Sequence, residues 1–307
     1  MLKGRKNMAS SIAFIGLGNM GGPMAANLVQ AGHQVKGYDL SSQSCDAAAE
    51  KGVTIAETTS AAVKDADVVV TMLPAGKHVL AVWSEISQAL KPGTLLIDCS
   101  TIDVESAREA HVLAKEASCL SLDAPVSGGT VGAAAGTLTF MVGGEEAAYQ
   151  RGDAILQAMA KRIVRCGGAG AGQAAKICNN MILGITMAGV CEAFVLGEKL
   201  GLSHQALFDV ASTSSGQCWS LTTYCPVPGP VPTSPANNGY KPGFAAALML
   251  KDLKLSQEAA AAAGATTEMG ARAAALYEDF SKHGQGDTDF SGLINFLREA
   301  SGRQSSE

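Results

Sequence analysis

The sequence lacks the features that mark several classes of protein. Its 307 residues include 23 basic and 28 acidic side chains, and the net charge of −5 gives no electrostatic basis for binding nucleic acid. The eight cysteines form no CxxC pair, and neither they nor the five histidines have the spacing of a zinc site, so we predict no metal. Cys99, Cys178 and Cys191 lie in apolar runs, which is typical of free buried thiols in a reducing compartment.

The sequence also lacks an evident targeting or membrane segment. The first residues, MLKGRKNMASS, are basic but contain no apolar stretch suited to a secretory signal. They are short for a transit peptide, a trimmed one stays open, and Met8 is an alternative start. We expect the bacterial cytoplasm, with the mitochondrial matrix as the alternative. The uncharged run from Ile177 to Cys191 is too short to span a bilayer, so we expect no membrane partner.

A glycine-rich motif near the N-terminus predicts a dinucleotide site. An apolar strand at 11–15 precedes GLGNMG, a helical segment follows, and a second strand at 34–38 ends at Asp39. In this fingerprint the first glycine allows a tight turn, and the second lets the backbone approach a pyrophosphate at the helix N-terminus. The third lets helix and strand pack closely. The loop residues are Gly16, Leu17, Gly18, Asn19, Met20 and Gly21.

The residue at the end of the second strand predicts which dinucleotide is bound. The Asp39 carboxylate can accept hydrogen bonds from a ribose 2′-hydroxyl, and its charge would repel a 2′-phosphate. No arginine follows it, since residues 40–42 are Leu, Ser and Ser. We therefore expect NAD rather than NADP.

Strands and helices continue to alternate through the N-terminal half. The strand Asp67–Leu73 is continuously apolar, as expected in a parallel sheet covered on both faces. Ligands gather at the carboxyl ends of such strands, so the loop at Pro74 and the residue Thr101 are candidate cofactor contacts, although Thr101 serves equally well as a helix N-cap. The further strands that we predict are Thr94–Cys99, Leu120–Ala124, Thr137–Val142 and Lys161–Cys166.

A small-residue loop follows the strand at 120–124. Ser127, Gly128 and Gly129 supply two successive glycine N–H groups and a hydroxyl, which together can seat a carboxylate. A plain flexible turn is the alternative for this loop taken alone.

GGAGAGQ, residues 167–173, marks the boundary between two predicted domains, 9–168 and 169–303. The helix that follows, Gly172–Gly201, has apolar side chains on every face, so we expect it to be buried all round and to join the domains. Such a helix needs cover on every side, which favours a homodimer or homotetramer. The helices that we predict beyond it are Gln205–Ser212, Ser220–Tyr224, Ala245–Ala263 and Met269–His283, with a proline-rich loop at Cys225–Gly243 and a frayed tail after Ser301.

The predicted fold class is therefore α/β. A Rossmann-type dinucleotide-binding domain is followed by an all-α domain, and a long buried helix joins the two.

One lysine lies in the first turns of the long helix. Lys176 precedes Asn180 by four residues, so both project from one face. A lysine beside so much apolar surface must snorkel to water, pair with an anion, or lose its proton more easily than usual. Snorkelling is the simplest interpretation of Lys176 alone, but beside a dinucleotide domain a role as general base explains it better.

Four motifs in order resemble the β-hydroxyacid dehydrogenases over nearly the whole chain. They are FIGLGNMGGPMAANL, DAPVSGGTVGAAAGTLTFMVGG, GQAAKICNNM, and PGF with LMLKDLKL. The stretch CWSLTTYCPVPG and its proline-rich continuation are similar to the 3-hydroxyisobutyrate branch of that family and to the related bacterial serine dehydrogenases.

The resemblance implies a role for each matching residue. Lys176 would be the catalytic lysine, and Lys251 would reach the cofactor from the helical domain. Trp219 and Tyr224 would line the substrate pocket, where the sequence alone would favour core aromatics. His78 departs from the asparagine that relatives often carry, which affects a single cofactor contact. The other implied residues are Ser127, Gly128, Gly129, Asn180 and Asp252 around the substrate, and Leu73, Pro74 and Thr101 around NAD.

The implied reaction is the NAD-dependent oxidation of 3-hydroxyisobutyrate to methylmalonate semialdehyde in valine catabolism, with Lys176 accepting the hydroxyl proton. A related enzyme acting on L-serine, tartronate semialdehyde or succinic semialdehyde is one alternative. A non-catalytic binding protein on the same fold is another, and the presence of Lys176, Asn180 and the Ser127–Gly129 loop argues against it.

Overall fold

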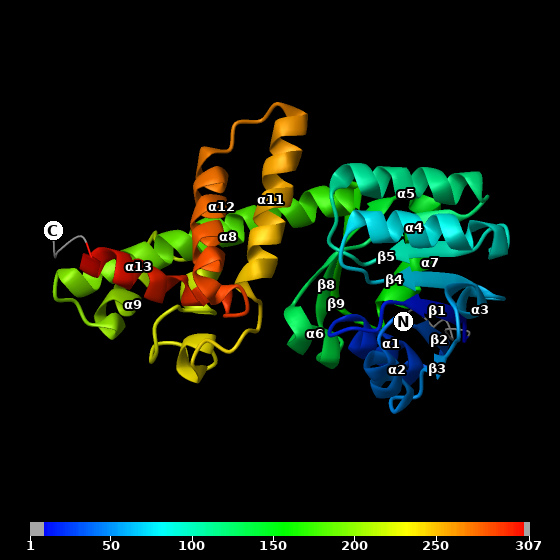
Figure 1. Cartoon of the computed structure of the whole chain (residues 1–307), viewed down its shortest axis with the longest axis horizontal. Helices are drawn as coiled ribbons and strands as arrows, with labels where there is room; N and C mark the ends of the chain where they lie inside the picture. Colours follow the sequence, from blue (N-terminus) through cyan, green and yellow to red (C-terminus); the bar gives the residue numbers. More distant parts are fainter. Residues whose placement is uncertain (1–8, 304–307) are drawn as a thin grey trace, which may run out of the picture. The chain divides into compact units, whose positions relative to one another are not determined.

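The chain forms two compact units, which divide between Lys176 and Ile177 (Figure 1). The computed structural model describes residues 9–303, so the basic residues 1–8, with the alternative start Met8, and the last four residues lie outside it. The first unit is a sheet with helices on both faces, and the second is helical. This arrangement confirms the predicted fold class.

Six strands of the first unit run parallel. They occur in the order β3, β2, β1, β4, β5, β6 across the sheet. The chain moves outward from β1 to β3 and then returns to place β4 on the other side of β1, so the strand order reverses between β1 and β4. Ligands of open α/β sheets bind at such a reversal, beyond the carboxyl ends of the strands. The bounds are β1 Ser11–Ile15, β2 Gln34–Tyr38, β3 Thr54–Ile55, β4 Val68–Thr71, β5 Leu95–Asp98 and β6 Leu120–Asp123.

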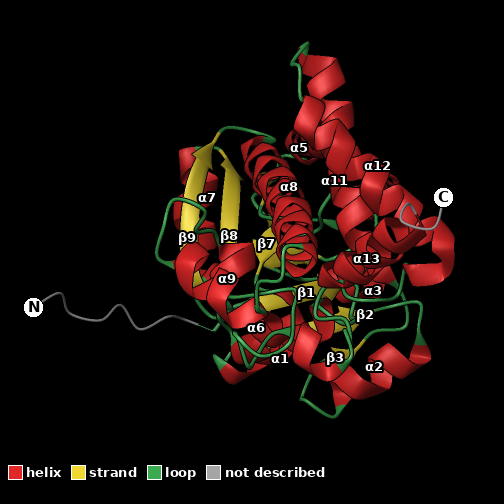
Figure 2. Ribbon diagram, turned by 90° about the vertical axis from the view of Figure 1, so that its left-hand side faces the viewer, coloured by secondary structure: helices red, strands yellow, loops and turns green. Residues whose placement is uncertain are grey.

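The remaining strands make the sheet mixed rather than purely parallel. β8 (Leu138–Gly144) runs antiparallel to β6 and to the two-residue strand β7 (Val126–Ser127), and parallel to β9 (Ala160–Gly167), beside which it lies in Figure 2. Residues 128–137 join β7 to β8 and include α6 (Gly129–Ala135) and a left-handed Gly136. This connection is too short for a parallel crossover of a dozen residues or more. The chain therefore turns straight back.

Helices cover both faces of this sheet. Along β1, Phe14 enters the core under α1 (Gly21–Gln30), α6 and α7 (Glu146–Leu156), while the next residue, Ile15, enters the core under the opposite helices. Those opposite helices are α3 (Thr59–Val63), α4 (Gly76–Ile86) and α5 (Val104–Glu116), and α4 and α5 lie side by side in Figure 1. The strands are thus buried on both sides, as their continuous apolar runs predicted. α2 (Ser42–Ala49) and the short turn at Ser87–Ala89 complete the unit.

The second unit packs helices around α8 (Ala171–Lys199), which begins in the first unit. α9 (His204–Ser212), α11 (Ala246–Ala263) and α12 (Glu268–Phe280) follow the predicted bounds closely. α10 (Trp219–Thr222) ends before Tyr224, and α13 (Leu293–Arg303) was not predicted. Its first residues, Leu293 and Ile294, belong to the same apolar core as Phe194 of α8 and Tyr277 of α12. The proline-rich segment is a loop with one short turn at Pro235–Asn238, as expected.

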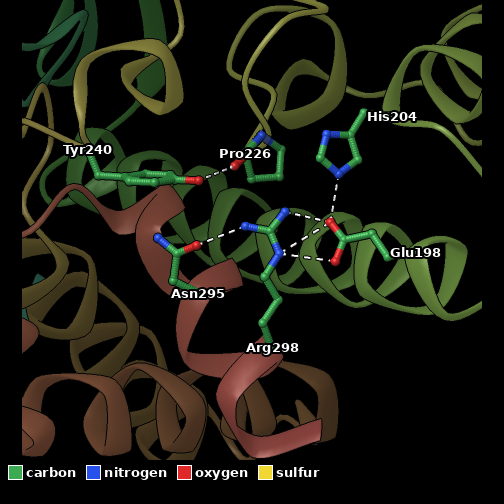
Figure 3. Close-up of polar contacts among 6 residues, drawn as sticks. All are labelled: Glu198, His204, Pro226, Tyr240, Asn295 and Arg298. Carbon is green, nitrogen blue, oxygen red and sulfur yellow. Dashed lines mark hydrogen bonds and ion pairs between the residues drawn. The ribbon is translucent and has the colours of Figure 1, made fainter. Parts of the chain in front are cut away.

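A charged cluster joins the end of α8 to α9 and α13 (Figure 3). Arg298 of α13 donates hydrogen bonds to both carboxylate oxygens of Glu198, and His204 at the start of α9 contacts the same carboxylate at 2.7 Å. The Arg298 guanidinium, more than His204, holds the pKa of Glu198 below its ordinary value. The Glu198 carboxylate thus joins α8, α9 and α13 at one place, and beside it Tyr240 donates to the Pro226 carbonyl within the proline-rich loop.

The expectation that α8 is buried all round is wrong. One of its sides packs into the helical core through residues such as Met187 and Phe194, but Ile182 and Leu196 on another side are 60% and 59% exposed. Cys178, expected to be buried, is exposed as well, whereas Cys99 and Cys191 are buried. The neighbouring helices of the same unit are too few to surround α8, which a residue pattern alone does not show.

Among residues 9–303, α8 is the one helix that is long and apolar enough to cross a membrane, with a mean hydropathy of 1.6. The packing of its inner side in the helical core is that of a core helix instead.

Candidate active site

Two glycines of the motif at the end of β1 are required by close backbone approaches. Gly16 has φ of +95°, and a Cβ there would lie 2.2 Å from the Met72 carbonyl oxygen of the neighbouring strand end. A Cβ on Gly21 would lie 1.9 Å from the Gly16 carbonyl oxygen, so any side chain would push α1 away from the loop. The tight turn and the close packing of helix on strand thus follow from the residues that the motif predicted.

The same loop fits a dinucleotide. A Cβ on Gly18 would meet no atom of the described residues within 4 Å, which leaves room for a pyrophosphate. The first turn of α1 carries no acidic side chain, and its N-cap, Met20, makes no side-chain capping hydrogen bond, so its backbone N–H groups suit an anion. Asp39 accepts hydrogen bonds from the backbone N–H groups of Leu17 at 2.6 Å and Ser41 at 2.8 Å. Its carboxylate is thereby fixed beside the glycine loop, where a ribose hydroxyl would bind.

A buried carboxyl at the end of β5 holds the loop after β4. Asp98 Oδ1 accepts hydrogen bonds from Thr71 Oγ1 at 2.7 Å and from Ser100 Oγ at 2.6 Å. Ser100 Oγ in turn accepts from the Leu73 backbone N–H at 2.8 Å. The candidate cofactor contact Leu73, which precedes Pro74, is therefore fixed through residues that sequence reasoning did not single out. Thr101, the third, follows Ser100 directly.

Burial raises the pKa of Asp98 to about 6, and its hydrogen bonds to Ser100 and Thr71 offset only part of that shift. The second oxygen, Oδ2, is buried without a hydrogen-bond partner among the described residues. Ionising Asp98 therefore costs more free energy here than in water, because a buried charge loses its hydration.

Replacing Asp98 with asparagine is expected to change how stability depends on pH. The folded-state pKa lies above the ordinary value of 3.8, so the wild type loses stability as pH rises from about 4 to about 6, by up to about 3 kcal/mol. Asparagine carries no charge to bury, so the free energy of unfolding of the variant should rise relative to that of the wild type between pH 4 and 6. The difference should remain at higher pH. Urea unfolding of both proteins between pH 4 and 8 measures this difference, and parallel curves would contradict it.

The small-residue loop at Ser127 lies between β7 and α6. Ser127 pairs with Thr139 of β8 and is half-buried, while Gly128 and Gly129 have φ of +135° and +60°. Gly128 is the N-cap of α6. The loop thus leaves strand geometry directly after the hydroxyl that we predict to hold the substrate.

A buried carboxylate also fixes the start of α8. Asp123, the last residue of β6, accepts hydrogen bonds from the backbone N–H groups of Gly170 and Gln173, each at 2.9 Å, and His111 Nε2 contacts it at 2.9 Å. The Gln173 side chain accepts from the Ile102 N–H at 3.2 Å and donates to the Ser100 carbonyl at 2.7 Å. The first turns of α8 are therefore tied to the carboxyl ends of β5 and β6.

Lys176 lies one turn beyond Gln173 on this anchored helix and is only 7% exposed. A side chain this little exposed does not extend into bulk water, so the snorkelling interpretation of Lys176 is not supported. Its amine is therefore placed inside the protein, on a helix turn whose position is fixed.

In the helical unit, the predicted substrate residues form two groups. Asn180, one turn after Lys176 on α8, is buried and donates a hydrogen bond through Nδ2 to Asp252 of α11. Lys251 precedes Asp252 on α11 and is half-buried. Asn180 is thus held in one orientation by a carboxylate that the resemblance had placed only around the substrate.

The second group is aromatic. The rings of Trp219 and Tyr224 stack with centroids 4.9 Å apart, and Trp219 is half-exposed. Tyr224 donates its hydroxyl to Asp289 Oδ2 at 2.9 Å, and the same oxygen accepts from the N–H groups of Gly243 and Phe244. Burial first, and the Asp289 charge second, raise the pKa of Tyr224 well above its ordinary value. Tyr224 therefore keeps its proton and has a fixed orientation, so it offers ring surface rather than acting as a general acid.

The structure groups the candidate residues within each unit. In the first unit, Leu17 is hydrogen-bonded to Asp39, Leu73 to Ser100, and the turn before Lys176 to the end of β6. In the second unit, Asn180 is hydrogen-bonded to Asp252, and Trp219 stacks on Tyr224. His78, the departure from the family motif, is exposed in the first turn of α4. The residues that sequence reasoning missed are Asp98, Ser100, His111, Asp123, Gln173 and Asp289; the acids at the ends of apolar strands were the one available signal, for Asp98 and Asp123.

Known families and proteins match the chain over nearly its whole length. Residues 11–168 match the NAD-binding domain of 6-phosphogluconate dehydrogenase, and residues 170–297 match the family described as NAD-binding of NADP-dependent 3-hydroxyisobutyrate dehydrogenase. A 3-hydroxyisobutyrate dehydrogenase of Pseudomonas aeruginosa is 47% identical over 92% of this chain and 95% of its own length. An NAD-dependent L-serine dehydrogenase of the same bacterium is 46% identical over 91% and 95%.

A solved structure is also similar to this chain over nearly its whole length. The Mycobacterium tuberculosis 3-hydroxyisobutyrate dehydrogenase with L-serine is 54% identical, with a TM-score of 0.93 over 95% of this chain and all of that one. Identity of this extent over full-length relatives, together with the glycine loop and Asp39, establishes the family. The chain belongs to the 3-hydroxyisobutyrate dehydrogenases, a family of NAD-dependent oxidoreductases.

Proposed function

We propose that the protein oxidises 3-hydroxyisobutyrate to methylmalonate semialdehyde with NAD, with Lys176 as the general base. The observation that carries this proposal is the position of Lys176. It is buried on the anchored first turns of α8, one turn before Asn180, in a chain with a complete dinucleotide loop.

Each site residue has a separate role in the proposed alcohol oxidation. Bound NAD would supply the acceptor for the hydride that leaves the hydroxyl-bearing carbon. Lys176 takes the hydroxyl proton, and in the reverse direction its ammonium donates a proton to the aldehyde oxygen. Asn180, held by Asp252, orients the substrate hydroxyl, and Ser127 with the N–H groups of Gly128 and Gly129 holds the carboxylate. Orientation and desolvation are the contributions of the protein.

The aromatic pair favours 3-hydroxyisobutyrate over serine. The stacked rings of Trp219 and Tyr224 offer apolar surface suited to a methyl group. An ammonium group would need an acceptor, and the Trp219 indole offers only an N–H donor. L-Serine is the second candidate, because the 54% identical mycobacterial protein was solved with it and a 46% identical relative is named for it.

Initial rates of NAD reduction decide between these substrates. We expect kcat/KM for one enantiomer of 3-hydroxyisobutyrate to exceed that for the other enantiomer, L-serine and tartronate by at least about tenfold, which corresponds to one methyl-sized difference in binding. A preference for L-serine would overturn the substrate and leave the roles of Lys176 and the glycine loop intact. No turnover of any of these acids, despite NADH binding, would overturn the oxidation itself.

A further inference from the structure

Gln173 in the first turn of α8 is fully buried, although glutamine is usually exposed. Its Oε1 accepts a hydrogen bond from the Ile102 backbone N–H at 3.2 Å, and its Nε2 donates one to the Ser100 carbonyl at 2.7 Å. Both ends of the amide are thus bonded to one short segment, 100–102, which lies far away in the chain. These two hydrogen bonds are here called the Gln173 bridge.

The segment 100–102 needs such a partner because the sheet ends before it. Asp98 is the last residue of β5, and the residues beside it in register are the last residues of β4 and β6. The chain beyond Asp98 remains buried at Ser100 and Ile102, where a backbone N–H or C=O without a partner costs stability. A glutamine side chain carries a donor and an acceptor as a peptide group does, so Gln173 takes the place of a neighbouring strand.

The bridged segment also carries contacts for the cofactor. Thr101, a candidate NAD contact, lies between the two residues that Gln173 holds. The Ser100 hydroxyl oxygen accepts from the Leu73 backbone N–H at 2.8 Å, so the loop of a second candidate contact is bonded to the same segment. On the helix side, Gln173 precedes Lys176 by three residues, and residues at this spacing share one face of a helix. Gln173 therefore connects the candidate NAD contacts to the proposed base.

We propose that Gln173 is a positioning residue that holds the candidate NAD contacts and the general base Lys176 in one arrangement, so that NAD affinity and proton transfer both depend on its amide. The part that concerns proton transfer rests on the proposed function, whereas the part that concerns NAD affinity does not. A small displacement of a catalytic group costs a large factor in rate, so a support shared by the cofactor contacts and the base preserves their alignment.

The start of α8 is already held without the Gln173 side chain. Asp123 accepts hydrogen bonds from the backbone N–H groups of Gly170 and Gln173, which satisfies donors that a helix leaves unpaired at its start. Both side-chain hydrogen bonds instead leave the helix for segment 100–102. A role in connecting these two parts therefore explains a buried glutamine here better than helix capping does.

Gln173→Met tests the proposal in the full-length protein, at a temperature at which circular dichroism shows the variant to be folded. Methionine is a good helix former of similar length, but it has no donor and is only a weak acceptor. We expect the Kd for NADH to rise by about fivefold or more and kcat to fall by about tenfold or more. In the cofactor-free protein, amide hydrogen exchange at Ile102 should be faster. Gln150→Met, at an exposed position on α7, is the matched control and should keep native values in all three measurements.

Two further variants separate the two sides of the bridge. Ser100→Ala removes the acceptor of the Leu73 N–H but keeps the carbonyl that Gln173 uses, so NADH affinity should fall more than kcat. Asp123→Ala keeps both hydrogen bonds of the bridge and releases the helix backbone, so kcat should fall more than NADH affinity.

Native kcat and native Kd in folded Gln173→Met would overturn the proposal, and so would a change in only one of them. If the native protein turned over none of the hydroxy acids, the proposed function would fail. Unchanged NADH affinity in Gln173→Met would overturn this inference whatever the substrate.

Gln173→Glu adds a test that depends on pH. Protonated glutamic acid has a donor and an acceptor, whereas the ionised carboxylate cannot donate to the Ser100 carbonyl. The NADH affinity and kcat of this variant, each divided by the native value at the same pH, should therefore rise as the pH falls from 8 to about 5.5, since burial favours the protonated form. Low ratios at every pH would overturn the bridge as the cause. Division by the native values removes the titration of the other ionisable groups of this network and helix turn, which are Asp98, Asp123, His111 and Lys176.

Discussion

Replacing Lys176 with alanine is expected to lower kcat by about a thousandfold or more, while the affinity for NADH changes little. Removing a positioned general base costs about 10²- to 10⁴-fold in rate, and we expect a buried base to lie in the upper part of that range. Lys176 is one turn beyond the glutamine that anchors α8, so alanine, a good helix former, should leave the helix intact. Steady-state rates and NADH fluorescence titration measure the two quantities.

Two control variants separate chemistry from charge and packing. Lys176→Arg keeps the positive charge, but arginine stays protonated under all ordinary conditions, so it cannot act as a base and should also be inactive. Lys115→Ala, at an exposed position on α5, should keep near-normal rates. Turnover in Lys176→Ala within a few-fold of the native rate would contradict the assignment of the base.

The N-terminal fold was predictable because its elements are determined locally. The turn at Gly16, the helix after Gly21 and the acid at Asp39 stand at fixed offsets that a dinucleotide loop requires, and the parallel strands are continuously apolar. The antiparallel course of β8 was not evident, since an apolar run such as Leu138–Val142 looks the same in either direction. Only the shortness of the connection after β7 determines its direction.

The anchoring residues of the site could not be predicted, because their partners are distant in the chain. Asp123 accepts hydrogen bonds from Gly170 and Gln173, which lie 47 and 50 residues further along the chain. Asp289 lies 65 residues after its partner Tyr224. No local spacing signals such contacts. The exposure of Cys178 and Ile182 was missed for a related reason: an apolar face predicts burial, but not whether the same chain or another copy buries it.

Replacing Asp123 with alanine is expected to lower the free energy of unfolding of the first unit by about 3–5 kcal/mol. Asp123 is a buried carboxylate, and the change would leave the N–H groups of Gly170 and Gln173 without their acceptor and His111 Nε2 without its carboxylate. Breaking a buried, charge-assisted network costs more than removing a surface group, because each abandoned polar group stays dehydrated. Urea unfolding measures the loss, and Asp46→Ala, an exposed acid on α2, should stay within about 0.5 kcal/mol of the native protein.

The same variant should separate anchoring from binding. Asp123 fixes the start of the helix that carries Lys176, so in the folded variant at low temperature kcat should fall by at least about tenfold, as misplaced catalytic groups do. The NADH affinity depends on the glycine loop and Asp39, which Asp123 does not contact through any hydrogen bond found in residues 9–303, and should stay within about twofold. Asp123→Asn, which keeps one acceptor oxygen, should fall between the native protein and the alanine variant in both stability and kcat. If Asp123→Ala lost stability but kept its native kcat when folded, the network would support the sheet without positioning the lysine.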